Sequence, residues 1–125
     1  MYHILVVDDE SRIRALIRKY AEFEGHTVTE AGDGMEAVNL CRTQTFDLII
    51  MDIMMPELDG HAATRAIRGM DRPDARLPII AMTANLFDED VAACLAAGMD
   101  AHIPKPLEAG QMIRTIAEWL ERKKQ

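Results

Sequence analysis

The sequence has few of the residues that mark specialised classes of protein. Only 5% of its 125 residues are aromatic, two are cysteines, and 14 basic residues stand against 21 acidic ones. Cys41 and Cys94 lie far apart and form no C-x-x-C pair, which favours reduced core thiols over a disulfide framework. A formal net charge of −7 lacks the basic footprint of a nucleic-acid surface. We therefore expect no direct nucleic-acid binding by this chain.

Metal-binding histidine patterns and membrane-spanning runs are also missing. The four histidines show neither i, i+4 nor cysteine-flanked spacing, which argues against a zinc site. No apolar run reaches membrane-spanning length, and no basic segment leads into a signal sequence. With 49% hydrophobic and 28% charged residues, the composition is that of a globular protein. We expect one cytoplasmic domain over residues 1–125, without membrane association.

Five short apolar runs alternate with five amphipathic stretches. The runs cover residues 3–7, 27–30, 46–51, 78–82 and 101–104, and apolar residues between them keep helical spacing. Asp33, with Glu36 three residues later, predicts a helix start, and Gly98 predicts a left-handed helix end. This alternation predicts an α/β fold, (βα)5, with a parallel sheet covered on both faces.

The composition of the runs predicts their order in the sheet. The first, third and fourth runs are almost continuously apolar, as strands buried on both faces should be. The second, TVTE, alternates and suits an edge, and the fifth contains Pro104, which cannot donate to a ladder and suits the other edge. The predicted order is 2-1-3-4-5, a flavodoxin-like doubly wound sheet.

Polar residues follow four of the five apolar runs. Asp8 and Asp9 follow the first, Asp52 the third, Thr83 the fourth and Lys105 the fifth. Ligands of such sheets bind outside the carboxyl ends of the strands, near the point where strand order reverses. Carboxylates about 4 Å apart repel by roughly 4 kcal/mol per pair at an effective dielectric constant near 20, which favours a bound cation, Mg²⁺ or Mn²⁺. With a hydroxyl and an ammonium group nearby, this edge suits a transferring phosphoryl group.

Four motifs, VVDDE, DLIIMDIMMPELDG, IIAMTAN and AGMDAHIPKPL, resemble in content and order those of the receiver domain of two-component response regulators, along the whole chain. The resemblance implies that Asp52 accepts a phosphoryl group from a phosphohistidine on a histidine kinase or a histidine phosphotransfer protein. It also implies that Asp9, Asp52 and the backbone carbonyl of Met54 bind Mg²⁺ directly, while Asp8 acts largely through water.

Further roles follow from the same resemblance. Thr83 and Lys105 would contact phosphoryl oxygens, and Pro106 would follow a cis peptide bond. Such a domain is no conventional enzyme, because it catalyses only its own phosphorylation and dephosphorylation. Movement of Thr83 would then shift the surface formed by the fourth helix, fifth strand and fifth helix (residues 86–125), where a partner or a second copy would bind.

His102 and Pro104 depart from the family pattern. His102 stands where the family usually has Tyr or Phe, so the usual aromatic switch is in question; a titratable switch and a surface histidine without a special role are the alternatives. Met54 and Asn85 stand where side chains influence hydrolysis of the acyl phosphate. Because apolar Met54 cannot orient a water molecule, we expect slow self-dephosphorylation.

Other functions remain as alternatives. A flavodoxin-like carrier of a small molecule would have a Ser/Thr/Gly-rich phosphate loop where this chain has Asp-Asp-Glu. A degenerate receiver would act as a protein scaffold without phosphorylation, although no acid or lysine is missing. The first half resembles regulators with a DNA-binding output domain and the second half resembles receivers of hybrid sensor kinases, so a stand-alone receiver and a part of either remain open.

Overall fold

The computed structural model describes residues 2–55, 57–70, 76–84 and 88–123. Five parallel strands form one sheet in the order β2-β1-β3-β4-β5, which confirms the predicted order and fold class. The strands are β1 (His3–Val7), β2 (Thr27–Ala31), β3 (Leu48–Asp52), β4 (Ile79–Thr83) and β5 (Ala101–Pro104). The helices are α1 (Ser11–Phe23), α2 (Gly34–Thr43), α3 (Gly60–Arg68), α4 (Asp88–Ala97) and α5 (Ala109–Lys123).

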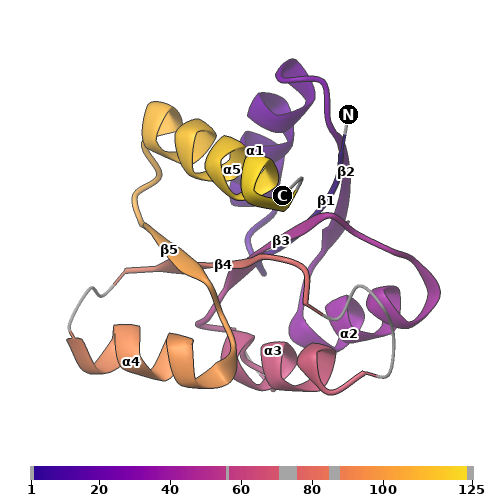
Figure 1. Ribbon diagram of the computed structural model, residues 1–125, viewed down its shortest axis with the longest axis vertical. Helices are drawn as coiled ribbons and strands as arrows, with labels where there is room; N and C mark the ends of the chain where they lie inside the picture. The colour runs from indigo at the N-terminus through magenta and orange to yellow at the C-terminus, as the bar shows by residue number, and fades with distance from the viewer. Residues whose placement is uncertain (1, 56, 71–75, 85–87, 124–125) are drawn as a thin grey trace.

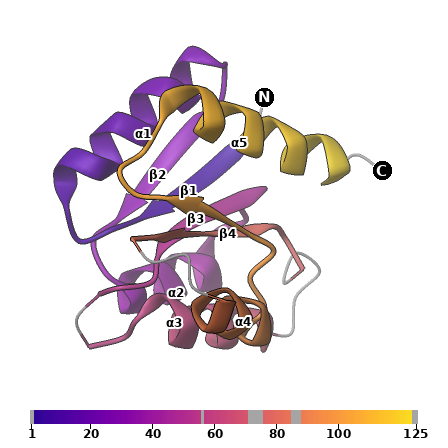
Figure 2. The same ribbon diagram turned by 90° about the vertical axis from the view of Figure 1, so that its left-hand side faces the viewer.

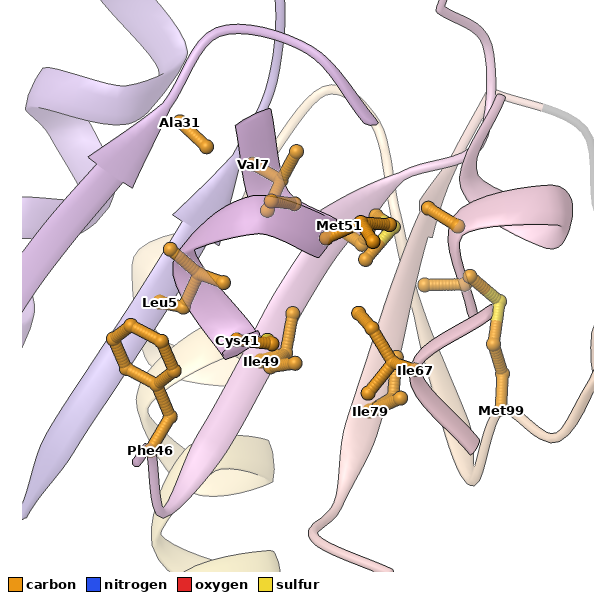
Figure 3. Packing of buried hydrophobic residues seen from close by; sticks show 14 of the residues in the cluster. Leu5, Val7, Ala31, Cys41, Phe46, Ile49, Met51, Ile67, Ile79 and Met99 are labelled. Carbon is orange, nitrogen blue, oxygen red and sulfur yellow. The ribbon is translucent and has the colours of Figure 1, made fainter. Parts of the chain in front are cut away.

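The sheet separates two helical layers. Helices α1 and α5 cover one face, and α2, α3 and α4 cover the other (Figures 1 and 2). Alternate residues of β1 divide between the two cores: Ile4 and Val6 pack with α1 and α5, whereas Leu5 and Val7 pack on the other side (Figure 3). This two-sided burial explains why β1, β3 and β4 are apolar at almost every position.

The helix ends follow the predicted capping signals with one difference. The Asp33 carboxylate accepts a hydrogen bond from the Glu36 N–H (2.7 Å), and Gly98 has φ 107°, so both predicted boundaries are confirmed. The Glu36 carboxylate, however, accepts from the N–H of Gly32 (2.8 Å) rather than from that of Asp33. The extended backbone of Asp33 brings the preceding amide within reach of this side chain.

Strand ends differ slightly from the prediction. Strand β3 begins at Leu48 rather than at residue 46, because buried Phe46 packs into the core from the preceding loop. Asp52 and Thr83 are the last residues of β3 and β4 rather than the first residues after them. The ladder extends to them because Asp52 pairs with Met82, and Thr83 with Pro104.

No helix in the part of the chain that the structure describes combines the length and the apolar character needed to cross a membrane.

Candidate functional site

Three acids gather at the carboxyl ends of β1 and β3, two neighbouring interior strands. Val7 pairs with Met51, so Asp8 and Asp52 occupy the next positions on the two neighbouring strands. One carboxylate oxygen from each of Asp8, Asp9 and Asp52 lies within 4.8 Å of the others. Asp8 and Asp52 are 0% and 3% exposed, whereas Asp9 is exposed. The sheet therefore brings together the three acids that the sequence placed at strand ends.

Lys105 enters the same cluster from the end of β5. Its Nζ lies 3.0 Å from Asp8 Oδ2 and 3.4 Å from Asp52 Oδ1. The backbone N–H of Lys105 donates to the carbonyl of Thr83 (2.9 Å), and the Lys105–Pro106 peptide bond is cis. The ammonium group thus contacts two carboxylates that belong to different strands.

The electrostatics of the site reflect an excess of negative charge. Burial raises the pKa of Asp52 above its ordinary value, and the Asp8 charge adds to this, although a hydrogen bond from the Met54 N–H (3.2 Å) and the Lys105 charge oppose it. Burial acts to lower the pKa of Lys105, but its contacts with Asp8 and Asp52 outweigh burial and raise that pKa. The pKa of Asp52 is therefore raised mainly by burial, and that of Lys105 by its two carboxylate partners.

The donor set fits a hard divalent cation. Opposite ligands of Mg²⁺ lie about 4.2 Å apart, close to the 4.8 Å within which the three oxygens lie. With all three acids ionised and Lys105 protonated, the group carries two net negative charges, which one divalent ion balances. Oxygen-only ligands with an exposed side at Asp9 leave positions for water and favour Mg²⁺ or Mn²⁺ over zinc.

The other predicted site residues lie around this cluster. Thr83 is 4% exposed at the end of β4, the strand next to that of Asp52. The Met54 side chain is 76% exposed. His102 is an exposed residue of β5 and lines a cavity of about 440 Å³ between α4, β5 and α5, together with Val91, Cys94, Leu95, Met99, Asp100, Ala101, Thr115, Glu118 and Trp119. Asn85 and several residues of the 86–125 surface lie outside the described residues.

One residue that supports the site was not recognised from the sequence. Gly60, the first residue of α3, lies so close to β3 that an added Cβ would be 2.5 Å from the carbonyl oxygen of Asp52. In the sequence, an Asp-Gly pair such as Asp59-Gly60 by itself indicates only a turn and a helix start. Nothing in the local pattern reports such an approach, because it depends on how α3 packs against the end of β3.

Comparison with known proteins places the chain in a family. Residues 4–117 match the family described as the response regulator receiver domain. The chain is 36% identical over 121 residues to the response regulator MprA of Mycobacterium tuberculosis, covering 97% of this chain and 51% of MprA. It is 35% identical over 118 residues to the sensor protein GacS of Pseudomonas syringae, covering 93% of this chain but 13% of GacS.

A solved structure shares the fold and holds a magnesium ion. The receiver domain of the sensor histidine kinase PA1611 from Pseudomonas aeruginosa PAO1, with a magnesium ion coordinated in its active-site cleft, is 36% identical. It superimposes with a TM-score of 0.86 over 96% of this chain and 98% of that chain. The chain therefore belongs to the response regulator receiver domain family and is a receiver domain of two-component signalling. It spans about half or less of the length of MprA and GacS.

Proposed function

We propose that this chain, as a single receiver domain, takes a phosphoryl group at Asp52 in a Mg²⁺-dependent reaction. The observation that carries the proposal is the contact of one ammonium group, Lys105, with two buried carboxylates at 3.0 and 3.4 Å. A third acid, Asp9, completes the group. This arrangement offers a nucleophile, a cation site and a counter-charge within one shared space.

The donor of the phosphoryl group is a phosphohistidine on a histidine kinase or a histidine phosphotransfer protein. A carboxylate oxygen of Asp52 attacks phosphorus in line, the P–N bond breaks, and its electron pair stays on the imidazole of the donor. Lys105 pairs with a phosphoryl oxygen, and Thr83 donates a hydrogen bond to another. The sensor kinase relatives support this class of donor.

Four groups of this chain would hold the metal ion. Asp9, Asp52 and the backbone carbonyl of Met54 would bind it directly, and Asp8 would act through water, with Mn²⁺ as an alternative ion. When bound, the ion neutralises charge on the equatorial phosphoryl oxygens. The chain itself is no conventional enzyme: it catalyses its own phosphorylation and dephosphorylation only.

Phosphorylation would be read out at the α4-β5-α5 surface. The acyl phosphate adds charge beside the end of β4, and the Thr83 backbone is hydrogen-bonded to Lys105 at the end of β5 (2.9 Å). A change at Thr83 can therefore alter the conformation of β5, of His102 and of the neighbouring cavity. It would thereby shift the populations of the conformations of the surface that a partner or a second copy binds.

The test is the intact mass of the protein after treatment with acetyl phosphate and magnesium. We expect the wild-type chain to gain the mass of one phosphoryl group, and we expect Asp52→Asn or chelation of magnesium to abolish the gain. Asp33→Asn is the matched control, because it removes one acid at an exposed helix cap where Asn also caps well. Equal labelling of Asp52→Asn and wild type would refute the proposal.

A further inference from the structure

Asp8 makes four hydrogen bonds, two through its backbone and two through its carboxylate. Its N–H donates to the carbonyl of Ala31 (3.2 Å), its Oδ1 accepts from the N–H of Glu10 (2.8 Å), and its Oδ2 accepts from Lys105 (3.0 Å). The fourth bond is made by its backbone carbonyl, which accepts from Nη1 of Arg14 at 2.6 Å. Ala31 ends β2, and Glu10 and Lys105 lie in the loops that follow β1 and β5, whereas Arg14 belongs to α1.

Arg14 is itself held by a second contact. Its Nε donates to Oε1 of Glu30 (2.9 Å), and the Arg14 side chain is only 20% exposed. Glu30 belongs to β2, which pairs with β1, so the guanidinium joins α1, β2 and the carbonyl of Asp8. Because a guanidinium is planar, fixing Nε on one partner also fixes the direction in which Nη1 donates.

The carbonyl that Arg14 holds belongs to the peptide unit between Asp8 and Asp9. In the described part of the chain, no hydrogen bond or ion pair holds the exposed Asp9 carboxylate, although one of its oxygens lies within 4.8 Å of oxygens of Asp8 and Asp52. The direction of the Asp9 side chain therefore depends on its backbone. Rotation of the Asp8–Asp9 peptide unit would carry Asp9 away from the other acids.

We propose that Arg14 is a positioning residue for the cation site. Its fork, anchored on Glu30, fixes the Asp8–Asp9 peptide unit and thereby keeps the Asp9 carboxylate beside Asp8 and Asp52. This inference rests on the proposed function, because it takes the three acids to form a site for Mg²⁺.

Positioning and charge predict opposite effects when Arg14 is removed. By charge alone, loss of a cation next to the acids should strengthen the binding of another cation. If Arg14 positions Asp9, its loss should weaken that binding, because a ligand is no longer held in place. The sign of the change in magnesium affinity therefore separates the two effects.

Two further variants serve as controls. Arg18 contacts the same glutamate, with its Nε 2.6 Å from Oε2 of Glu30, but among the described residues its side chain bonds only to Glu30 and Glu22. Arg18→Ala thus removes an equal charge from the same network and leaves the Asp8 contact. Arg14→Lys keeps the charge, but its single ammonium group cannot reproduce the two-pronged contact with Glu30 and Asp8.

The experiment measures the magnesium dissociation constant by calorimetry for wild type, Arg14→Ala, Arg14→Lys and Arg18→Ala at one ionic strength. We expect Arg14→Ala to lose about tenfold in affinity, as is typical for residues that orient metal ligands. Arg14→Lys should lose less, and Arg18→Ala should bind as wild type does or more tightly. Equal affinities of Arg14→Ala and Arg18→Ala would overturn the inference while leaving the proposed function intact.

A second readout does not require bound metal. In nuclear magnetic resonance spectra of the metal-free protein, the Asp9 amide should shift and gain mobility in Arg14→Ala but not in Arg18→Ala. An Asp9 amide unchanged in Arg14→Ala would also overturn the inference. If wild type itself failed to bind magnesium, the proposed function would fall, and this measurement would still decide whether Arg14 positions Asp9.

Discussion

The approach of Gly60 to β3 gives a sharp prediction about the site. A Cβ at position 60 would lie 2.5 Å from the carbonyl oxygen of Asp52 and 2.7 Å from Cα of Ile53. Both neighbours are backbone atoms of the segment that carries the proposed phosphoacceptor. Gly60→Ala must therefore move α3, the end of β3, or both.

The size of the effect follows from this overlap. The contact with the Asp52 carbonyl is about 0.9 Å shorter than the 3.4 Å at which such contacts become ordinary. Overpacking of a buried site by one carbon typically costs 1–3 kcal/mol, and a backbone neighbour cannot change rotamer, so we expect about 3 kcal/mol of lost stability. That loss lowers the melting temperature by roughly 10–15 °C in a domain of this size.

The assay combines urea unfolding with labelling by acetyl phosphate. Gly69→Ala is the matched control, because Gly69 ends the same helix in right-handed helical backbone. Apart from its chain neighbours, the nearest atom of the described residues to its added Cβ would be the carbonyl oxygen of Arg65 at 3.4 Å. We expect this control to gain about 0.4–1 kcal/mol through reduced entropy of the unfolded chain. Gly60→Ala should in addition be labelled more slowly than Gly69→Ala.

Two results would refute this reasoning. One is a Gly60→Ala variant whose unfolding free energy lies within about 0.5 kcal/mol of wild type, a range usual for surface substitutions. The other is equal destabilisation by Gly60→Ala and Gly69→Ala, which would show that the effect belongs to α3 in general rather than to its approach to Asp52.

Two further predictions concern the acid that takes the phosphoryl group. Burial and the Asp8 charge raise the pKa of Asp52, so the folded protein favours the protonated carboxyl more than the unfolded chain does, where the pKa is about 4. The stability that this preference contributes is lost as pH rises from about 4 through the folded-state pKa. Metal-free Asp52→Asn should therefore be more stable than wild type in urea unfolding at pH 7, with a smaller difference toward pH 4; equal stability at pH 7 would contradict this. Because the exposed Met54 thioether is only a weak hydrogen-bond acceptor, labelled protein should lose its phosphate slowly, and a lifetime of seconds would contradict that expectation.

Much of the fold could be predicted because it rests on local periodicity. Two-sided burial of β1, β3 and β4 leaves an apolar residue at almost every position, and that property needs no knowledge of neighbours. The prediction of strand ends was wrong where an apolar residue packs into the core without pairing with a neighbouring strand. Phe46 is buried but precedes β3, and a pattern of apolar residues cannot separate these two uses.

The candidate site was partly predictable for a related reason. In a parallel sheet, the carboxyl ends of all strands lie at one edge, so polar residues after apolar runs meet there once the strand order is known. Asp8, Asp52 and Lys105 are close for this reason. The role of His102, and that of Asn85, which the structure does not describe, remain predictions.

By itself, the sequence determined the alternation of strands and helices, the order of the sheet and the set of acids at its edge. Only the tertiary structure decided which groups support those acids: the fork of Arg14 between Glu30 and the Asp8 carbonyl, and the space at Gly60 that a side chain would fill. The physical reason is that periodicity along a chain records which face of an element is buried. Contacts such as the one between Arg14 and Glu30, 16 residues apart, depend on the distance and angle at which a helix packs on a strand.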